Sequence, residues 1–263
     1  IVSLCGGVPV VIETKEENEF RLTADELREK ITDKTKLLVL PYPNNPTGAI
    51  MRREDLEAVA KVLKDTNIMK ASDEIYSELT YSGKHCSIAE IEGMRERTIV
   101  INGFSKSFAM TGWRLGFLGG PKEIVSQMLK LHQYAIMSSP TVSQYAAIVA
   151  MHSCQKDIDA MRNEYNIRRR FVVDSFNKLG LKCFAPQGTF YVFPCIKSTG
   201  MTSTDFCEKL VYTKKVAVVP GDAFGECGEG YVRVSYAYSL NHLREAIKRI
   251  GEFLEDIKNG NVQ

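Results

Sequence analysis

The sequence of 263 residues lacks several features that mark particular classes of protein. It has no apolar run long enough to cross a bilayer, no internal repeat and no low-complexity segment. It also lacks an excess of charge, because 34 Lys and Arg against 32 Asp and Glu leave a net charge of only +2. We therefore expect neither nucleic acid nor an anionic membrane among its partners.

The cysteines and histidines lack the spacing of a metal site. The seven cysteines are odd in number and include no C-x-x-C pair, and the four histidines are scattered. This distribution favours reduced, mostly buried thiols over a disulfide framework or a zinc site. We expect a cytoplasmic protein with no bound metal.

What the sequence does contain is an alternation of apolar strands and amphipathic helices. Strands are expected at residues 8–12, 36–40, 67–72, 98–102 and 114–118. A capping box formed by Thr23 and Glu26 begins one helix, and residues 51–63 form another with Leu56, Val59, Ala60 and Leu63 inward. This order predicts an α/β fold with a mostly parallel sheet, in which ligands bind beyond the carboxyl ends of the strands.

The pattern changes after residue 153. A charged helix over residues 157–179 precedes short strands at 182–184, 189–193 and 231–236. A closing helix carries an apolar stripe formed by Leu243, Ile247, Ile250, Leu254 and Ile257. We therefore expect a large domain over residues 1–153, and an interdomain helix with a smaller α+β domain over residues 154–263.

The most informative segment is residues 103–116, GFSKSFAMTGWRLG. It holds Lys106 on a turn of glycine and serine, and Arg114 beside the only tryptophan. A partly desolvated lysine amine can act as a nucleophile, and an arginine can hold a phosphate through paired hydrogen bonds. Together these groups suit pyridoxal phosphate. Either residue alone would more simply be a solvated surface charge.

The whole segment resembles the lysine motif of class I and II aminotransferases, which are pyridoxal 5′-phosphate enzymes of fold type I. The resemblance extends from about Val8 to the C-terminal helix. It implies that Lys106 holds the cofactor as a Schiff base and then moves a proton as general base and acid, and that Arg114 binds the phosphate. The implied reaction is a ping-pong transfer of an amino group between an amino acid and a 2-oxo acid.

Three further residues fit the same cofactor. Asn45, in the segment NNPTG, and Asp73, in the segment DEIY, each follow a predicted strand, as Lys106 does, so all three are expected at one sheet edge. The resemblance assigns Asp73 to the pyridine nitrogen, where a carboxylate favours the protonated ring. It assigns Asn45 and Tyr76 to the phenolic oxygen. Without the lysine motif, a plain loop and a helix-capping aspartate would explain these segments.

Arg233 is the candidate for substrate binding. Alternation along residues 231–236 puts it on one face with Tyr231 and Ser235. The resemblance assigns it to the substrate's α-carboxylate, which a guanidinium can bind with two parallel hydrogen bonds. A solvated strand arginine is the simpler interpretation of the residue alone. Residues 188–191 and 220–221 also resemble family segments, with less specific roles.

Two features depart from the family pattern. Gly103 stands where many relatives carry a phosphate-binding serine, and the sequence leaves open whether Ser105 or Ser107 replaces it. Family members also carry further chain before the position that matches Ile1, so we expect this chain to be part of a longer enzyme. Because family members are usually homodimers, we expect a homodimer.

Two other functions could use this sequence. A carbon–sulfur β-lyase would employ the same residues but expel a leaving group from the β-carbon. An aminotransferase-like ligand-sensing domain of a transcription regulator would require a DNA-binding domain upstream. Assays for pyruvate release against amino transfer distinguish the first alternative, and the sequence before Ile1 distinguishes the second.

Overall fold

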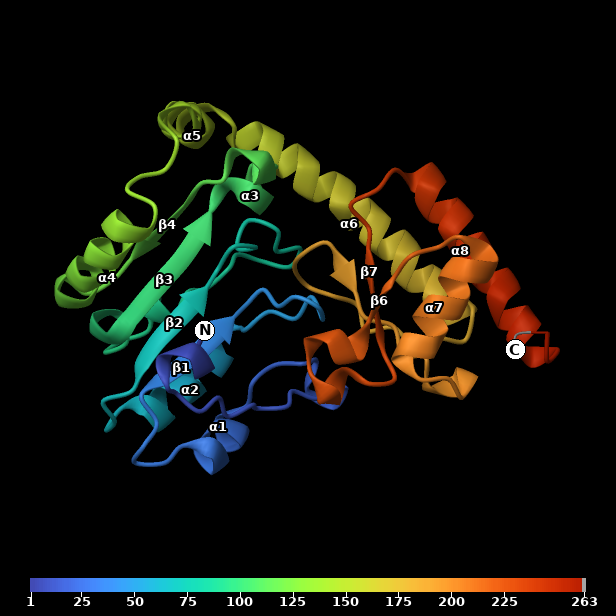
Figure 1. Ribbon diagram of the computed structural model, residues 1–263, viewed down its shortest axis with the longest axis horizontal. Helices are drawn as coiled ribbons and strands as arrows, with labels where there is room; N and C mark the ends of the chain where they lie inside the picture. Colours follow the sequence, from blue (N-terminus) through green and yellow to red (C-terminus); the bar gives the residue numbers. More distant parts are fainter. Residues whose placement is uncertain (262–263) are drawn as a thin grey trace.

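The first half of the chain forms a four-stranded sheet in the computed structural model, which describes residues 1–261 (Figure 1). The strands are β1 (Leu37–Pro41), β2 (Met69–Asp73), β3 (Thr98–Gly103) and β4 (Gly116–Gly119). They lie in the order β1-β2-β3-β4, and β1, β2 and β3 are parallel whereas β4 runs antiparallel to β3. The predicted α/β fold with a mostly parallel sheet is confirmed.

The helices of this half follow the local sequence signals. They are α1 (Ala24–Lys30), α2 (Arg53–Leu63), α3 (Phe104–Ser107), α4 (Lys122–Ala135) and α5 (Thr141–Ser153). At the start of α1 the Glu26 N–H donates to the Thr23 hydroxyl at 3.2 Å, and the Thr23 N–H donates to the Glu26 carboxylate at 2.9 Å. Helix α2 buries Leu56, Val59, Ala60 and Leu63. Both predictions are confirmed.

The second half is built around the long helix α6 (Gln155–Lys178), which runs from α5 toward α7 and α8 (Figure 1). The remaining elements are β5 (Tyr191–Val192), α7 (Ser203–Lys214), β6 (Val219–Pro220), β7 (Val232–Ser235) and α8 (Leu240–Lys258). Strand β7 pairs antiparallel with both β5 and β6. The predicted stripe of α8 packs into this core, with Leu243, Ile250 and Leu254 buried and Ile247 and Ile257 partly buried.

Two predicted strands are wrong. Residues 8–12 are extended but have no strand beside them, and Val8 is 84% exposed. Residues 182–184 also form no strand, because the Cys183 N–H donates to the Asn177 side chain at 3.0 Å instead of to a neighbouring strand. β-Branched and apolar residues fit a strand only where a partner completes the backbone hydrogen bonds.

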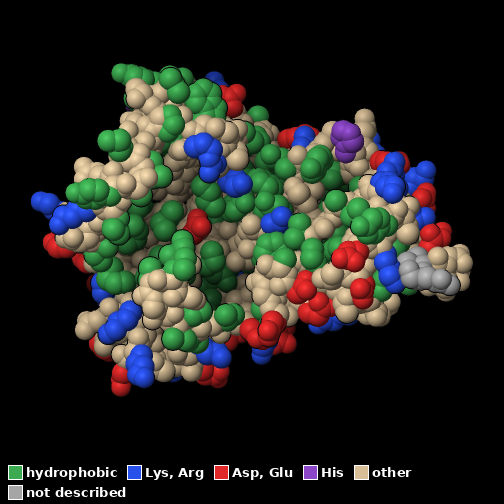
Figure 2. Space-filling view, viewed as in Figure 1, with side chains coloured by type: hydrophobic (Ala, Val, Ile, Leu, Met, Phe, Trp, Pro, Cys, Tyr) green, Lys and Arg blue, Asp and Glu red, His purple; other side chains and the backbone are tan. Residues whose placement is uncertain are grey.

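Several strand residues leave apolar side chains at the surface. Leu37, Val39, Ile101 and Leu118 share one face of the sheet and are each at least 38% exposed, and we call them the apolar strand patch. Phe117, on the opposite face, is also exposed. Helices α4 and α5 also expose apolar side chains, among them Tyr134 and Tyr145. Figure 2 shows hydrophobic side chains gathered around a hollow on the side of the molecule that holds the sheet. Surfaces of this kind commonly mark interaction sites.

The structure also tests what the sequence indicated about membrane spans, metal sites and cysteines. Among residues 1–261 no helix is both long and apolar enough to cross a membrane, and no three potential ligands of the His, Cys, Asp or Glu type gather as in a metal site. All seven cysteines are free thiols, but only Cys183 and Cys207 are buried. The expectation of mostly buried thiols is therefore wrong.

Candidate active site

Three of the predicted site residues follow the carboxyl ends of neighbouring parallel strands. Strand β1 ends at Pro41, shortly before Asn45, and Pro41 is paired with Asp73 at the end of β2. Strand β3 ends at Gly103, and Lys106 lies in the single turn of α3 that follows. Because parallel strands end at one edge of the sheet, these polar groups emerge on the same side.

Two aromatic rings flank the amine of Lys106. Its Nζ lies 5.8 Å from the centre of the Tyr76 ring and 5.7 Å from that of Phe190. The two rings pack edge to face, with their centres 5.5 Å apart. The buried Phe104 anchors the turn through its N–H, which donates to the Leu115 carbonyl at 3.2 Å. The amine therefore meets a partly apolar wall, which limits its hydration.

Tyr76 is held in a turn that starts at Asp73. The Asp73 carboxylate accepts a hydrogen bond from the Ile75 N–H at 3.2 Å, and the Tyr76 hydroxyl lies 3.4 Å from that of Tyr191. Burial, with a smaller contribution from Tyr191, raises the pKa of Tyr76 well above its ordinary value. The hydroxyl therefore keeps its proton and remains a hydrogen-bond donor.

Arg233 on β7 lies between two aromatic rings. Its guanidinium carbon is 4.4 Å from the centre of the Tyr191 ring and 4.8 Å from that of Phe224, and its Nη1 donates to Asn45 Oδ1 at 2.9 Å. Such stacking leaves the edge of the guanidinium to form hydrogen bonds. Asn45 is therefore hydrogen-bonded to Arg233, and Tyr76 to Tyr191.

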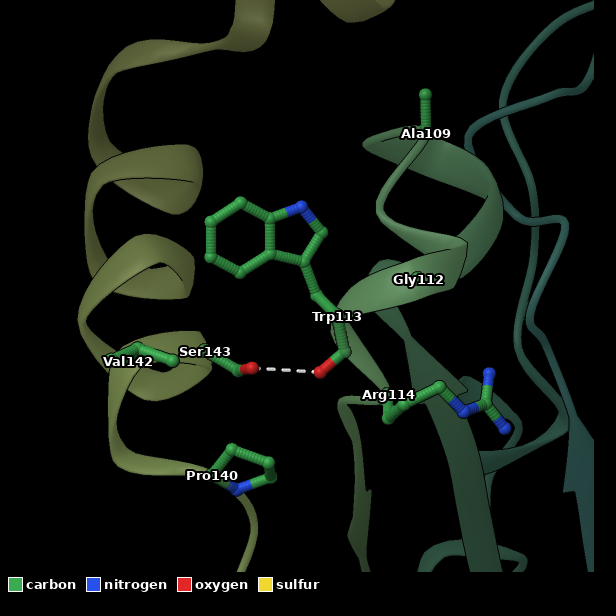
Figure 3. A pocket seen from close by; sticks show the side chains of 7 residues that line it. All are labelled: Ala109, Gly112, Trp113, Arg114, Pro140, Val142 and Ser143. Carbon is green, nitrogen blue, oxygen red and sulfur yellow. Dashed lines mark hydrogen bonds between the residues drawn. The ribbon is translucent and has the colours of Figure 1, made fainter.

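Arg114 follows the 3-10 turn Thr111–Trp113, which comes shortly after α3 in the chain. It adopts a left-handed backbone conformation, with φ of 54°, and its Nη1 donates to the Thr111 carbonyl at 3.0 Å. It lines a hollow of about 450 Å³ with Trp113 and Ser143, whose Oγ donates to the Trp113 carbonyl at 2.7 Å. In Figure 3 the Trp113 indole lies toward α5, whereas the exposed Arg114 side chain extends to the opposite side.

The packing around Gly103 is tight. A Cβ atom there would lie 3.1 Å from both the Gly116 Cα and the Ile75 Cδ1, which is closer than ordinary contact. A serine would therefore need the Gly116 backbone and the Ile75 side chain to move by a few tenths of an ångström. Of the two nearby serines, Ser107 is 3% exposed and Ser105 is half-buried.

Three aromatic residues at the site lacked an assigned role in the sequence. Phe190 flanks Lys106, and Tyr191 and Phe224 enclose Arg233. The signal that could have identified Tyr191 is strand pairing, because it lies opposite Ser235, on the same face of β7 as Arg233. Phe224 follows the Pro220-Gly221 segment, whose turn directs it back toward β7.

The chain is similar to known aminotransferases. A family model described as "Aminotransferase class I and II" matches residues 1–250. The chain is 47% identical over 260 residues to an aspartate aminotransferase of Pyrococcus abyssi, covering 98% of this chain and 67% of that protein. It is equally similar to aromatic-amino-acid aminotransferase 2 of Thermococcus litoralis, at 47% identity with 98% and 67% coverage.

A solved structure supports the same relationship. The aromatic aminotransferase from Pyrococcus horikoshii OT3 superposes with a TM-score of 0.95 at 46% identity, covering 98% of this chain and 70% of that one. The chain spans about two thirds of the length of the curated relatives that it matches. Members of this family are pyridoxal 5′-phosphate enzymes of fold type I. The chain therefore belongs to the class I and II aminotransferase family.

Proposed function

We propose that the protein is a pyridoxal phosphate-dependent aminotransferase, which moves an amino group between an amino acid and a 2-oxo acid by a ping-pong mechanism. The observation that carries this proposal is the position of the Lys106 amine, beside the packed rings of Tyr76 and Phe190 at the carboxyl edge of parallel strands. Membership of the aminotransferase family supports it.

The donor set suits the cofactor. Pyridoxal phosphate presents an aldehyde, a phenolic oxygen, a ring nitrogen and a phosphate, and the chain offers a matching group for each. We assign the Lys106 amine to the aldehyde, Asn45 and Tyr76 to the phenolic oxygen, Asp73 to the ring nitrogen and Arg114 to the phosphate. When bound, the cofactor withdraws electrons from the substrate's α-carbon and so makes its proton easier to remove.

Each residue has a defined task in this proposal. The Asp73 carboxylate favours a proton on the ring nitrogen, because opposite charges attract most strongly away from water. The Tyr76 hydroxyl donates a hydrogen bond, since burial keeps it protonated. The Lys106 amine accepts the proton from the substrate's α-carbon as a general base and later returns a proton as a general acid.

Arg233 is assigned to the substrate's α-carboxylate. The rings of Tyr191 and Phe224 hold the guanidinium plane on both sides, and Asn45 holds one of its nitrogens. A planar guanidinium fixed in this way suits the planar carboxylate of an amino acid. The names of the relatives point to aspartate and to aromatic amino acids as the first substrates to assay.

Four further features belong to the same proposal, two from the family resemblance and two, the location and the domains, from the cysteine usage and the change of sequence pattern after residue 153. They are a homodimer, a cytoplasmic location, a role in amino acid metabolism, and the division of the chain into domains over residues 1–153 and 154–263.

The test compares Lys106→Ala with Lys130→Ala, which alters an exposed lysine on α4. Each protein is incubated with pyridoxal phosphate, freed of excess and measured for visible absorbance and for amino transfer to 2-oxoglutarate. We expect Lys106→Ala to lose the absorbance band and nearly all turnover, and Lys130→Ala to keep both. Substantial transfer by Lys106→Ala would refute the proposal. Pyruvate and ammonia released from cystathionine in place of amino transfer would indicate the β-lyase instead.

A further inference from the structure

A buried polar cluster lies next to the candidate site but takes no part in the chemistry proposed above. Its centre is Glu74, which directly follows Asp73 and is only 5% exposed. The Glu74 Oε1 accepts hydrogen bonds from the Ser72 hydroxyl at 2.8 Å and the Ser87 hydroxyl at 2.6 Å. The His85 Nε2 lies 2.9 Å from the Glu74 Oε2. We call these four residues the Glu74 cluster.

The cluster keeps a buried carboxylate charged. Burial by itself raises the pKa of Glu74, but the contacts with His85 and Ser87, the charge of His85 and the Ser72 hydroxyl together hold that pKa below its ordinary value. Apart from this carboxylate, His85 Nε2 has no partner within residues 1–261. Removing His85 would leave the Glu74 carboxylate with only the two serine hydroxyls, and removing Glu74 would leave His85 Nε2 without a partner among residues 1–261, so each side chain supports the position of the other.

The members of the cluster come from the two ends of one excursion of the chain. Ser72 lies in β2 and Glu74 directly follows the last residue of that strand, where the Glu74 N–H donates to the Ile101 carbonyl of β3 at 2.8 Å. His85 and Ser87 come after the excursion, which covers residues 75–84. The Glu74 carboxylate therefore joins both ends of this segment, which lowers the conformational freedom of everything between them.

The excursion carries Tyr76 and is attached to the other wall of the site. Thr80 forms a bridge with Gly188, and the Tyr81 N–H donates to the Gln187 carbonyl at 2.8 Å. Gln187 and Gly188 stand two to three residues before Phe190, whose ring lies beside the Lys106 amine. The position of the Tyr76 ring thus depends on the contacts that join the two ends of residues 75–84, which are those of Glu74 with His85 and Ser87.

We propose that Glu74 and His85 are positioning residues, which lock the base of residues 75–84 and thereby hold the Tyr76 hydroxyl where it meets the cofactor's phenolic oxygen. This inference rests on the proposed function only for the role of Tyr76. Neither side chain touches the substrate or the cofactor in this scheme, because both act through the excursion.

The first measurement is hydrogen exchange in the complete protein without cofactor, comparing wild type, His85→Gln and the control His152→Gln, which alters an exposed histidine on α5. The reporters are the amides of Ser77, Leu79 and Tyr81, which donate to Glu74, Tyr76 and Gln187. We expect His85→Gln to exchange about tenfold faster at these amides, since local opening becomes easier, with the amides of α2 unchanged. Unchanged exchange at all three would overturn the proposal.

The second measurement uses the visible absorbance of the loaded enzyme as a function of pH. Loss of a hydrogen bond to a charged phenolic oxygen changes the pH at which the absorbance change is half complete. His85→Gln should therefore shift this midpoint by about one pH unit, in the same direction as Tyr76→Phe does. The double variant should match Tyr76→Phe alone, because both changes remove the same contact. Additive shifts would contradict a positioning role.

The two measurements separate the failure of this inference from that of the proposed function. If the wild type takes up no cofactor, the proposed function fails and the exchange experiment alone decides. If His85→Gln does not fold, Ser87→Ala removes a single donor from the same carboxylate and is compared in the same way.

Discussion

At the residue scale, Lys70 on β2 is an energetically unfavourable side chain. It is 0% exposed, and its Nζ has no hydrogen-bond partner within residues 1–261. Burial, with a smaller contribution from the charge of Arg97, lowers its pKa from 10.5 to about 8. Protonated Lys70 is therefore costly in the folded chain at neutral pH.

Lys70→Met should raise the free energy of unfolding at pH 7 by on the order of 3 kcal/mol, because the apolar side chain of similar length removes this cost. In the wild type the cost is fully present below pH 8 and declines toward pH 10.5, since the unfolded chain then binds more protons than the folded one. The advantage of the variant should shrink over that range. Urea unfolding at pH 7 and above pH 8 tests this, with the exposed Lys61→Met as control. Equal stability of variant and wild type at pH 7 would contradict it.

At the element scale, the geometry of Arg233 depends on three elements that meet: β5 with Tyr191, β7 with Arg233 itself, and the short 3-10 helix Gly221–Phe224. No single element would hold the guanidinium plane. Contacts between elements also explain the errors in the predicted strands. The apolar composition of residues 8–12 predicts a strand, but no neighbouring strand is present to pair with it. Predictions for α1 and α2 were accurate because capping and helical periodicity are local.

Phe224→Ala should therefore affect substrate binding more than chemistry. Loss of one stacked ring removes about 1 kcal/mol of support for the guanidinium, which corresponds to an increase in KM of about fivefold. We expect kcat and the visible absorbance of the cofactor to change little. Arg233→Ala should raise KM further and also leave the absorbance intact. Steady-state kinetics with aspartate and with an aromatic amino acid measure the effect, and a fall in kcat at unchanged KM would contradict this role.

At the scale of the whole molecule, the apolar strand patch and the exposed apolar side chains of α4 and α5 present several large apolar residues to solvent. Apolar surface of this extent favours association, since burying it releases structured water. The near-neutral net charge of +2 gives little repulsion to oppose it.

The 263-residue chain by itself should consequently bind a hydrophobic dye and elute in size-exclusion chromatography as a species larger than 29.5 kDa. Leu37→Thr combined with Val39→Thr should reduce both, because it makes two exposed patch residues polar with threonine, a β-branched side chain that suits a strand. A monomeric elution volume without dye binding would show that the patch is not a site of association.

The sequence by itself determined the features that depend on near neighbours. The helix start at Thr23, the buried face of α2, the alternation that gives a parallel sheet and the lysine motif of residues 103–116 are all encoded within short segments. The same segments were enough to indicate the family. Local periodicity and motif spacing suffice where the interacting groups are close along the chain.

Only the tertiary structure decided how those segments meet. Asn45 and Arg233 are 188 positions apart and form a hydrogen bond, and Tyr76 and Tyr191 lie together across 115 positions. The Glu74 cluster likewise depends on where the chain returns after residue 84. Such contacts follow from the packing of whole elements against one another, and no local pattern records which elements will become neighbours.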